Sequence, residues 1–105
     1  MPTSFQQLVY AATRTIPRGR VATYKLLADH IGCRSCRAVG QALKRNPDAP
    51  RVPCHRVIAS DGTLGGFQGR CAGAALRRKT YLLAAEGVRF SHGRLADPRR
   101  LFRFA

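Results

Sequence analysis

The apolar residues near the start of the chain recur with the period of an α-helix. In the range 4–14 they occupy positions i, i+3, i+4 and i+7, namely Phe5, Leu8, Val9 and Ala12. This spacing predicts a helix, and Thr3 or Ser4 can cap its first turn. The range 23–31 repeats the pattern and predicts a second helix that begins after Thr23. Its apolar stripe is Tyr24, Leu27, Ala28 and Ile31.

A third helical pattern, over 35–45, separates apolar from basic positions. The expected buried stripe is Cys36, Val39, Gly40 and Leu43, and the opposite side carries Arg34, Arg37, Gln41, Lys44 and Arg45. Two short helices joined by a tight turn, the second basic on its free side, predict a helix-turn-helix. Helix pairs of this shape also serve as plain packing units, so both interpretations stay open here.

Beyond residue 46 the pattern breaks into shorter pieces. The three prolines in 47–53 predict a rigid loop, and the apolar residues in 57–59 predict a short extended segment. The four glycines in 60–69 predict a hairpin or a glycine-rich loop. A last helix is predicted over 72–85, with Leu76, Thr80 and Leu83 inward and Arg77, Arg78 and Lys79 outward. The tail, 88–105, mixes aromatic, leucine and arginine residues, and its pattern does not decide whether it docks.

These elements predict a mainly α-helical fold with a short β element, of the winged-helix-like helix-turn-helix class. A length of 105 residues fits one domain, 1–105. No apolar run approaches the roughly 18 residues of a membrane span, and the N-terminus lacks the pattern of a secretory signal. We therefore expect no membrane association.

The charge is strongly one-sided. Nineteen lysines and arginines face five acidic residues, which gives a formal net charge of +14. Such a balance favours polyanionic partners, nucleic acid first. The alternative is a basic protein whose charge only keeps it soluble.

Four cysteines are present: Cys33, Cys36, Cys54 and Cys71. Cys33 and Cys36 form a CxxC pair, which could begin a zinc site or a redox pair. No second CxxC or HxxxH motif completes a metal site, so we expect no metal and no cofactor. The alternative for Cys33 and Cys71 is that they are small, partly buried apolar residues.

The segment Pro53-Cys54-His55-Arg56-Val57 carries the most chemistry. A free thiol has a pKa of about 8.5, so a reactive cysteine needs a base or a positive charge nearby. His55 could serve if an acceptor fixed its tautomer. The single glutamate, Glu86, stands at the end of the last predicted helix, where a carboxylate opposes the helix dipole. That position suggests a use for Glu86, although a solvated surface residue is the ordinary interpretation.

Four sequence motifs together resemble the active-site domain of O6-alkylguanine-DNA alkyltransferases. In order along the chain they are RAVGQALKRNP, PCHRVI, LGGFQGR and LLAAEG. The resemblance runs from about Phe5 to Val88. It implies a suicide DNA repair enzyme that transfers the alkyl group irreversibly to its own cysteine, and no separate N-terminal domain. The roles it implies are Cys54 as acceptor, His55 as proton relay through water, Glu86 behind it, Asn46 as a brace of the active-site turn, and Tyr24 beside the lesion.

The resemblance also implies how duplex DNA is held. The target base must be flipped out, and Arg37 would fill the gap that it leaves. Other residues implied at the DNA are Arg34, Ala38, Gly40, Gln41 and Lys44, and the pocket would be lined by Val57, Gly65, Gly66 and Phe67. Basic residues would supply affinity that is independent of sequence and sensitive to salt.

Two departures from the family pattern stand out. Phe67 replaces a frequent tyrosine, and the segment 69–75 looks longer than usual. Alkyltransferase-like proteins are similarly short and bind alkylated DNA without transferring the alkyl group. The alternative function of this chain is therefore to bind the lesion and mark it for other repair proteins, which would be its partners. They have Trp or Ala at the acceptor position, whereas this chain has Cys54. We expect a monomer that binds double-stranded DNA containing O6-alkylguanine, cytoplasmic and nucleoid-associated in a prokaryote or nuclear in a eukaryote.

Overall fold

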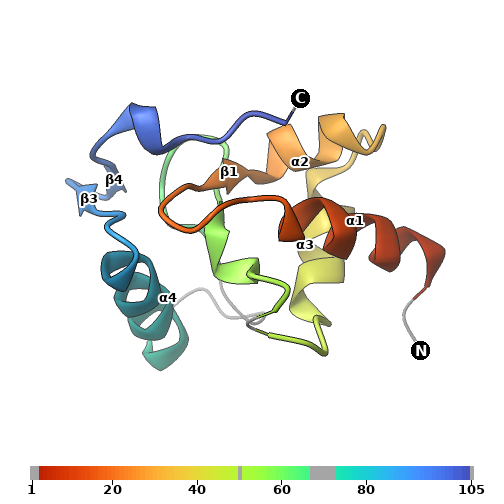
Figure 1. Ribbon diagram of the computed structural model, residues 1–105, viewed down its shortest axis with the longest axis horizontal. Helices are drawn as coiled ribbons and strands as arrows, with labels where there is room; N and C mark the ends of the chain where they lie inside the picture. Colours follow the sequence, from red (N-terminus) through yellow and green to blue (C-terminus); the bar gives the residue numbers. More distant parts are fainter. Residues whose placement is uncertain (1–2, 50, 67–72, 105) are drawn as a thin grey trace.

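The computed structural model describes residues 3–49, 51–66 and 73–104, and it confirms the mainly helical fold with a small strand element. The helices are α1 (Ser4–Arg14), α2 (Tyr24–His30), α3 (Cys36–Lys44) and α4 (Ala74–Ala85). The strands are β1 (Ala22–Thr23), β2 (Val57–Ile58), β3 (Phe90–Ser91) and β4 (Arg94–Leu95), and two 3₁₀ turns cover Cys54–Arg56 (η1) and Pro98–Arg100 (η2). In Figure 1, α1–α3 gather on one side, α4 and the β3–β4 hairpin on the other, with β1 between them.

Side-chain caps explain where the first three helices begin. Thr3 forms a capping box with Gln6, in which each side chain bonds the other residue's backbone N–H. Thr23 accepts from the Leu26 N–H at 3.0 Å, and the Ser35 hydroxyl accepts from the Ala38 N–H at 3.0 Å. Thr3, rather than Ser4, is thus the first cap.

Helices α1, α2 and α3 pack on one another around the main core. The Tyr10 hydroxyl donates to the Ala42 carbonyl at 2.7 Å and ties α1 to α3. One position in the predicted stripe of α3 is wrong. Cys36, the first residue of α3, is exposed, and the buried residues of this helix are Val39, Ala42 and Leu43.

Strands β1 and β2 pair in parallel, with Ala22 opposite Val57 and Thr23 opposite Ile58. The connection between them runs through α2, α3 and the proline loop. This pairing confirms the extended segment and places η1, which carries Cys54, directly before a buried strand.

Helix α4 departs from the predicted inward and outward residues. Lys79 was predicted to face solvent, but it is fully buried, and Thr80 is exposed. Leu83 is fully buried as predicted. The reason lies in the hydrogen bonds of the Lys79 ammonium, described below.

The C-terminal tail docks on the body of the domain. Phe90 and Ser91 pair antiparallel with Leu95 and Arg94, and Leu101 forms a parallel bridge with Val21. The ring of Phe104 stacks on His30 at the end of α2, with centroids 4.6 Å apart. Figure 1 shows the tail running from the hairpin to α2. Within the described ranges, no helix is long and apolar enough to cross a bilayer.

Candidate active site

Cys54 begins the η1 turn and is 8% exposed. Its N–H donates to the Val52 carbonyl at 2.8 Å, which bends the chain sharply before β2. Asn46, at the end of α3, braces this bend: its Nδ2 donates to the Val52 carbonyl at 2.9 Å and its Oδ1 accepts from the Asp48 N–H at 3.0 Å. The bracing geometry expected of Asn46 is therefore present.

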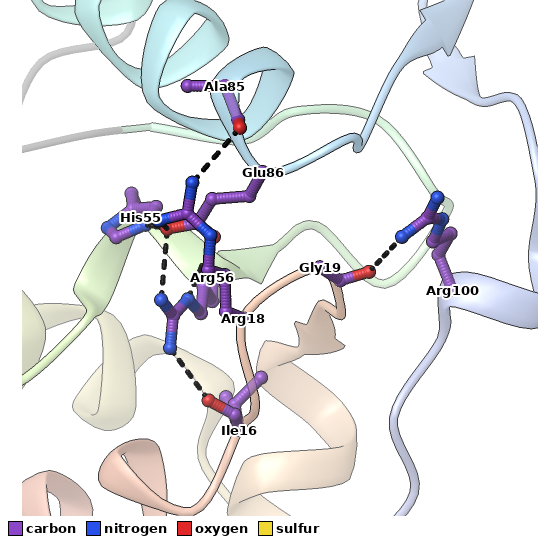
Figure 2. Close-up of polar contacts among 8 residues, drawn as sticks. All are labelled: Ile16, Arg18, Gly19, His55, Arg56, Ala85, Glu86 and Arg100. Carbon is purple, nitrogen blue, oxygen red and sulfur yellow. Dashed lines mark hydrogen bonds and ion pairs between the residues drawn. The ribbon is translucent and has the colours of Figure 1, made fainter.

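Glu86 is the C-cap residue of α4, and its side chain is only 7% exposed. Its carboxylate accepts from His55 Nε2 at 3.0 Å, and from Arg56 Nε and Nη2 at 2.9 Å each (Figure 2). Burial raises the pKa of this carboxyl, but the hydrogen bonds from Arg56 and His55 outweigh burial and hold the pKa at about 2. Glu86 is thus an ionised, buried acceptor, and not a solvated surface residue.

The state of His55 follows from that of Glu86. Burial lowers the pKa of His55, against the opposing effect of Glu86, so the imidazole is neutral at pH 7. An ionised carboxylate can only accept, so His55 Nε2 must carry the proton and donate it. The other ring nitrogen, Nδ1, is then unprotonated and able to accept a proton.

Arg56 was considered in the sequence only as a nearby charge. In the structure it also donates from Nη1 to the Ile16 carbonyl at 2.9 Å, so it links Glu86 to the segment after α1. Arg18, in the turn that follows, donates to the Ala85 carbonyl at 3.1 Å and lies 4.0 Å from Glu86 Oε2. No periodicity points to these contacts, because they join segments 30 or more residues apart.

Lys79 is the functional candidate that the sequence interpretation missed. Its ammonium donates to three backbone carbonyls, those of Val57 at 2.7 Å, Leu64 at 2.6 Å and Gly66 at 2.8 Å. Burial lowers its pKa to about 7, and negative charge on Cys54 acts in the opposite direction. One signal was available: Lys79 lies three residues after Leu76 and four before Leu83, on the apolar stripe itself.

The bonds from Lys79 gather the predicted pocket residues. Val57 is fully buried, and the Tyr24 hydroxyl donates to the Gly66 carbonyl at 3.4 Å. Gly65 has a positive φ of 72°, and a Cβ there would come within 3.2 Å of the Ala59 nitrogen and 3.3 Å of the Tyr24 ring. A side chain at this position would therefore displace the Tyr24 ring or the backbone of Ala59. Phe67 and the segment 67–72, with Cys71, lie outside the described residues.

The predicted DNA-facing side of α3 is open. Arg34, Arg37, Gln41 and Lys44 are exposed, and Ala38 and Gly40 are half-buried. A Cβ on Gly40 would meet no atom within 4 Å, so packing inside the chain does not require glycine there. Among the described residues, no group of three His, Cys, Asp or Glu side chains could hold a metal ion.

Fold and site together define a small basic helix-turn-helix domain with a buried cysteine next to a histidine–carboxylate pair. Residues 4–88 match the family model of the 6-O-methylguanine DNA methyltransferase, DNA binding domain. The chain belongs to this family.

Comparison with known relatives gives the same placement. The methylated-DNA–protein-cysteine methyltransferase of Mycobacterium leprae is 46% identical over 85 residues, which cover 80% of this chain and 48% of that protein. The chain spans about half the length of the curated relatives that it matches first.

Two solved structures with DNA are also similar. Mycobacterium tuberculosis OGT in complex with DNA superposes with a TM-score of 0.72 at 45% identity, over 82% of this chain and 51% of that one. S. pombe Atl1 in complex with damaged DNA containing O6-carboxymethylguanine superposes with a TM-score of 0.81 at 34% identity, over 95% of both chains.

Proposed function

We propose that this chain repairs O6-alkylguanine in duplex DNA by transferring the alkyl group to Cys54. The observation that carries the proposal is the arrangement of Cys54 directly before His55, whose imidazole donates to the ionised carboxylate of Glu86. The family membership and the residues matched, 4–88, support the same chemistry.

The proposed reaction is a single displacement. His55 Nδ1 takes the thiol proton of Cys54 through a water molecule, and Glu86 stabilises the imidazolium that forms. The thiolate sulfur attacks the alkyl carbon, so the S–C bond forms as the C–O6 bond breaks. The electron pair remains on guanine, which takes up a proton. The Tyr24 hydroxyl, which donates to the Gly66 carbonyl at 3.4 Å in this structure, would assist this step. The balance is one thiol and one alkylguanine converted to one thioether and one guanine.

Access to the buried O6 atom requires the nucleotide to leave the stack, at a cost of a few kcal/mol. The exposed side of α3 supplies the contacts for this step. Arg37 would fill the gap in the duplex, and Gly40 would let the helix backbone approach the groove closely. The minor groove shows a degenerate pattern, which suits a protein that must act in any sequence.

Because the thioether is stable, each molecule acts once. Restoring the thiol would require cleavage of the S–C bond of this thioether. The amount of lesion removed should therefore equal the amount of active protein, with no turnover.

A second candidate function is lesion binding without transfer. The likeness to Atl1 favours this candidate, because the folds superpose with a TM-score of 0.81 and the solved Atl1 structure holds damaged DNA containing O6-carboxymethylguanine. Cys54 and its histidine–glutamate pair favour transfer, since binding alone does not require a thiol with a proton acceptor beside it.

One experiment separates the two functions. Wild type and Cys54→Ala are mixed with a duplex that contains one O6-methylguanine and with the same duplex unmodified. Binding is measured by gel shift, and the lesion by chromatography of the digested DNA. Transfer predicts loss of O6-methylguanine with wild type only. Lesion binding predicts tight, selective complexes with both proteins and an unchanged lesion. Equal binding to both duplexes without loss would contradict both functions and point to a plain basic regulator.

A further inference from the structure

The turn Pro17–Arg20 lies against the carboxylate end of the candidate site. The Arg20 N–H closes the turn on the Pro17 carbonyl at 3.1 Å. The preceding residue, Ile16, accepts from Arg56, and Arg18 reaches the last turn of α4 and Glu86. Figure 2 shows Gly19 of this turn between the η1 residues His55 and Arg56 on one side and Arg100 on the other. The turn is therefore linked to Glu86 in two ways, directly through Arg18 and indirectly through the bond from Arg56 to Ile16.

A residue of the tail holds this turn from the other side. Arg100 donates from Nη1 to the Gly19 carbonyl at 3.1 Å, the dashed contact on the right of Figure 2. Its guanidinium also lies against Gly87, the residue after Glu86, where a Cβ would come within 3.3 Å of Nη2. A Cβ on Gly19 would come within 3.0 Å of Arg100 Nη1 and 3.3 Å of the Glu86 carbonyl oxygen. The guanidinium therefore fits in a space that two glycines leave open.

The backbone around Arg100 is anchored on both sides. The Arg100 carbonyl accepts from the Val21 N–H at 2.9 Å, and the Phe102 N–H donates to the Val21 carbonyl at 2.6 Å. Arg100 is the last residue of the η2 turn, which is capped by Asp97, whose side chain accepts from the Arg99 N–H at 3.0 Å. Arg100 is thus held at a fixed place relative to β1, although it lies beyond the family match, which ends at residue 88.

We propose that Arg100 is a positioning residue of the candidate active site: it clamps the turn Pro17–Arg20 to the C-terminal end of α4 and so fixes the Glu86 carboxylate against His55. The clamp acts through Glu86, and not directly on the Cys54 thiol. This proposal rests on the proposed role of the His55–Glu86 pair.

The consequence concerns the basicity of His55. The charged groups that face His55 are Glu86 and Lys79 from α4 and Arg56 from its own turn, and of these only Glu86 raises its pKa. A carboxylate that is less well aligned supports the imidazolium less. Proton transfer from Cys54 to His55 then becomes harder, and the thiol reacts only at higher pH.

The test measures the reactivity of Cys54 without DNA. Wild type, Arg100→Ala, Arg100→Lys and the control Arg103→Ala are treated with iodoacetamide from pH 5 to 9. Labelling is followed by mass spectrometry on the tryptic peptide 52–56, with Cys36 as an exposed internal control. Arg103 is an exposed arginine of the same tail, so Arg103→Ala changes the net charge of the protein by the same amount as Arg100→Ala.

We expect Arg100→Ala to slow Cys54 labelling about tenfold at pH 7, since a misplacement of about 1 Å can lower a rate by about a hundredfold and Glu86 keeps its bonds to Arg56. The pH midpoint should move upward, and Cys36 should be unaffected. Arg100→Lys should fall between wild type and Arg100→Ala. Arg103→Ala should match wild type.

A profile of Arg100→Ala that coincides with that of Arg103→Ala would overturn the proposal, as would a loss of thermal stability with an unmoved midpoint. If Arg100→Ala does not fold, the pH profiles of Cys54 labelling are compared between Arg100→Lys and Arg103→Lys. Identical profiles of these two variants would overturn the proposal. Failure of the wild type to remove O6-methylguanine would contradict the proposed function, yet it would leave this comparison of thiol reactivity intact.

Discussion

Replacing Glu86 by glutamine keeps the shape of the side chain but removes the charge that three N–H groups share. The new amide would also turn an N–H₂ group toward donors on His55 and Arg56. With the carboxylate gone, the largely buried guanidinium of Arg56 loses its only anionic partner among the described residues and keeps only the Ile16 carbonyl. We therefore expect a large loss of stability together with a loss of reactivity at Cys54.

The size of the loss follows from the pKa of Glu86. That pKa lies at about 2 in the folded protein and at 4.5 ordinarily. A gap of about 2.5 units corresponds to at most about 3.5 kcal/mol of stabilisation at neutral pH, at about 1.4 kcal/mol per unit, and partial screening by solvent lowers this to about 3 kcal/mol. Because the folded pKa is the lower one, this stabilisation is complete above about pH 4.5 and is lost as the pH falls toward 2.

The assay is urea unfolding followed by far-UV circular dichroism, at intervals from pH 6 to pH 2, for wild type and Glu86→Gln. The two free energies of unfolding should differ by about 3 kcal/mol at pH 6, and the difference should shrink steadily below pH 4.5. The other carboxylates, Asp29, Asp48, Asp61 and Asp97, are the same in both proteins and cancel. A difference that stays constant down to pH 2, or is below about 1 kcal/mol at pH 6, would refute the reasoning.

Two further predictions concern Lys79 and the exposed side of α3. Lys79→Met leaves three carbonyl oxygens without their donor and should lower the free energy of unfolding by about 3 kcal/mol or more. The exposed control Arg78→Met should change it by under about 0.5 kcal/mol. Equal losses in urea unfolding would contradict a stabilising role of the buried Lys79 ammonium. Arg37→Ala should impair alkyl transfer more than DNA affinity, whereas Lys44→Ala should lower affinity and reduce the salt slope by about one unit at most. Equal effects of these two variants on transfer and affinity would remove the intercalating role of Arg37.

The helices could be predicted from the sequence because their signals are local. Apolar spacing and a capping residue lie within one or two turns of each other, so Thr3, Thr23 and Ser35 mark helix starts almost to the residue. The β1–β2 pair could not be predicted in the same way. It joins two-residue strands 35 positions apart, and two residues carry no period.

In the candidate site, too, some contacts could be predicted from the sequence and others could not. The contact between His55 and Glu86 was expected from the resemblance to a known family and from the unusual position of a single glutamate. Lys79 was placed on the wrong side because a charged residue is rarely buried, and the carbonyls that satisfy it come from two distant segments. The contacts of Arg100 depend on where the tail docks, which its mixed pattern left undecided.

The central claim is that Cys54 accepts an alkyl group, and mass spectrometry of the tryptic peptide 52–56 tests it most directly. The protein is incubated with an excess of duplex containing O6-methylguanine, then digested beside Cys54→Ala and a sample given unmodified duplex. We predict that the wild-type peptide gains the mass of one methylene group, approaching one per protein, and that the peptides with Cys33, Cys36 and Cys71 gain none. A folded wild type that binds the lesion, yet yields only the unmodified peptide, would contradict the account.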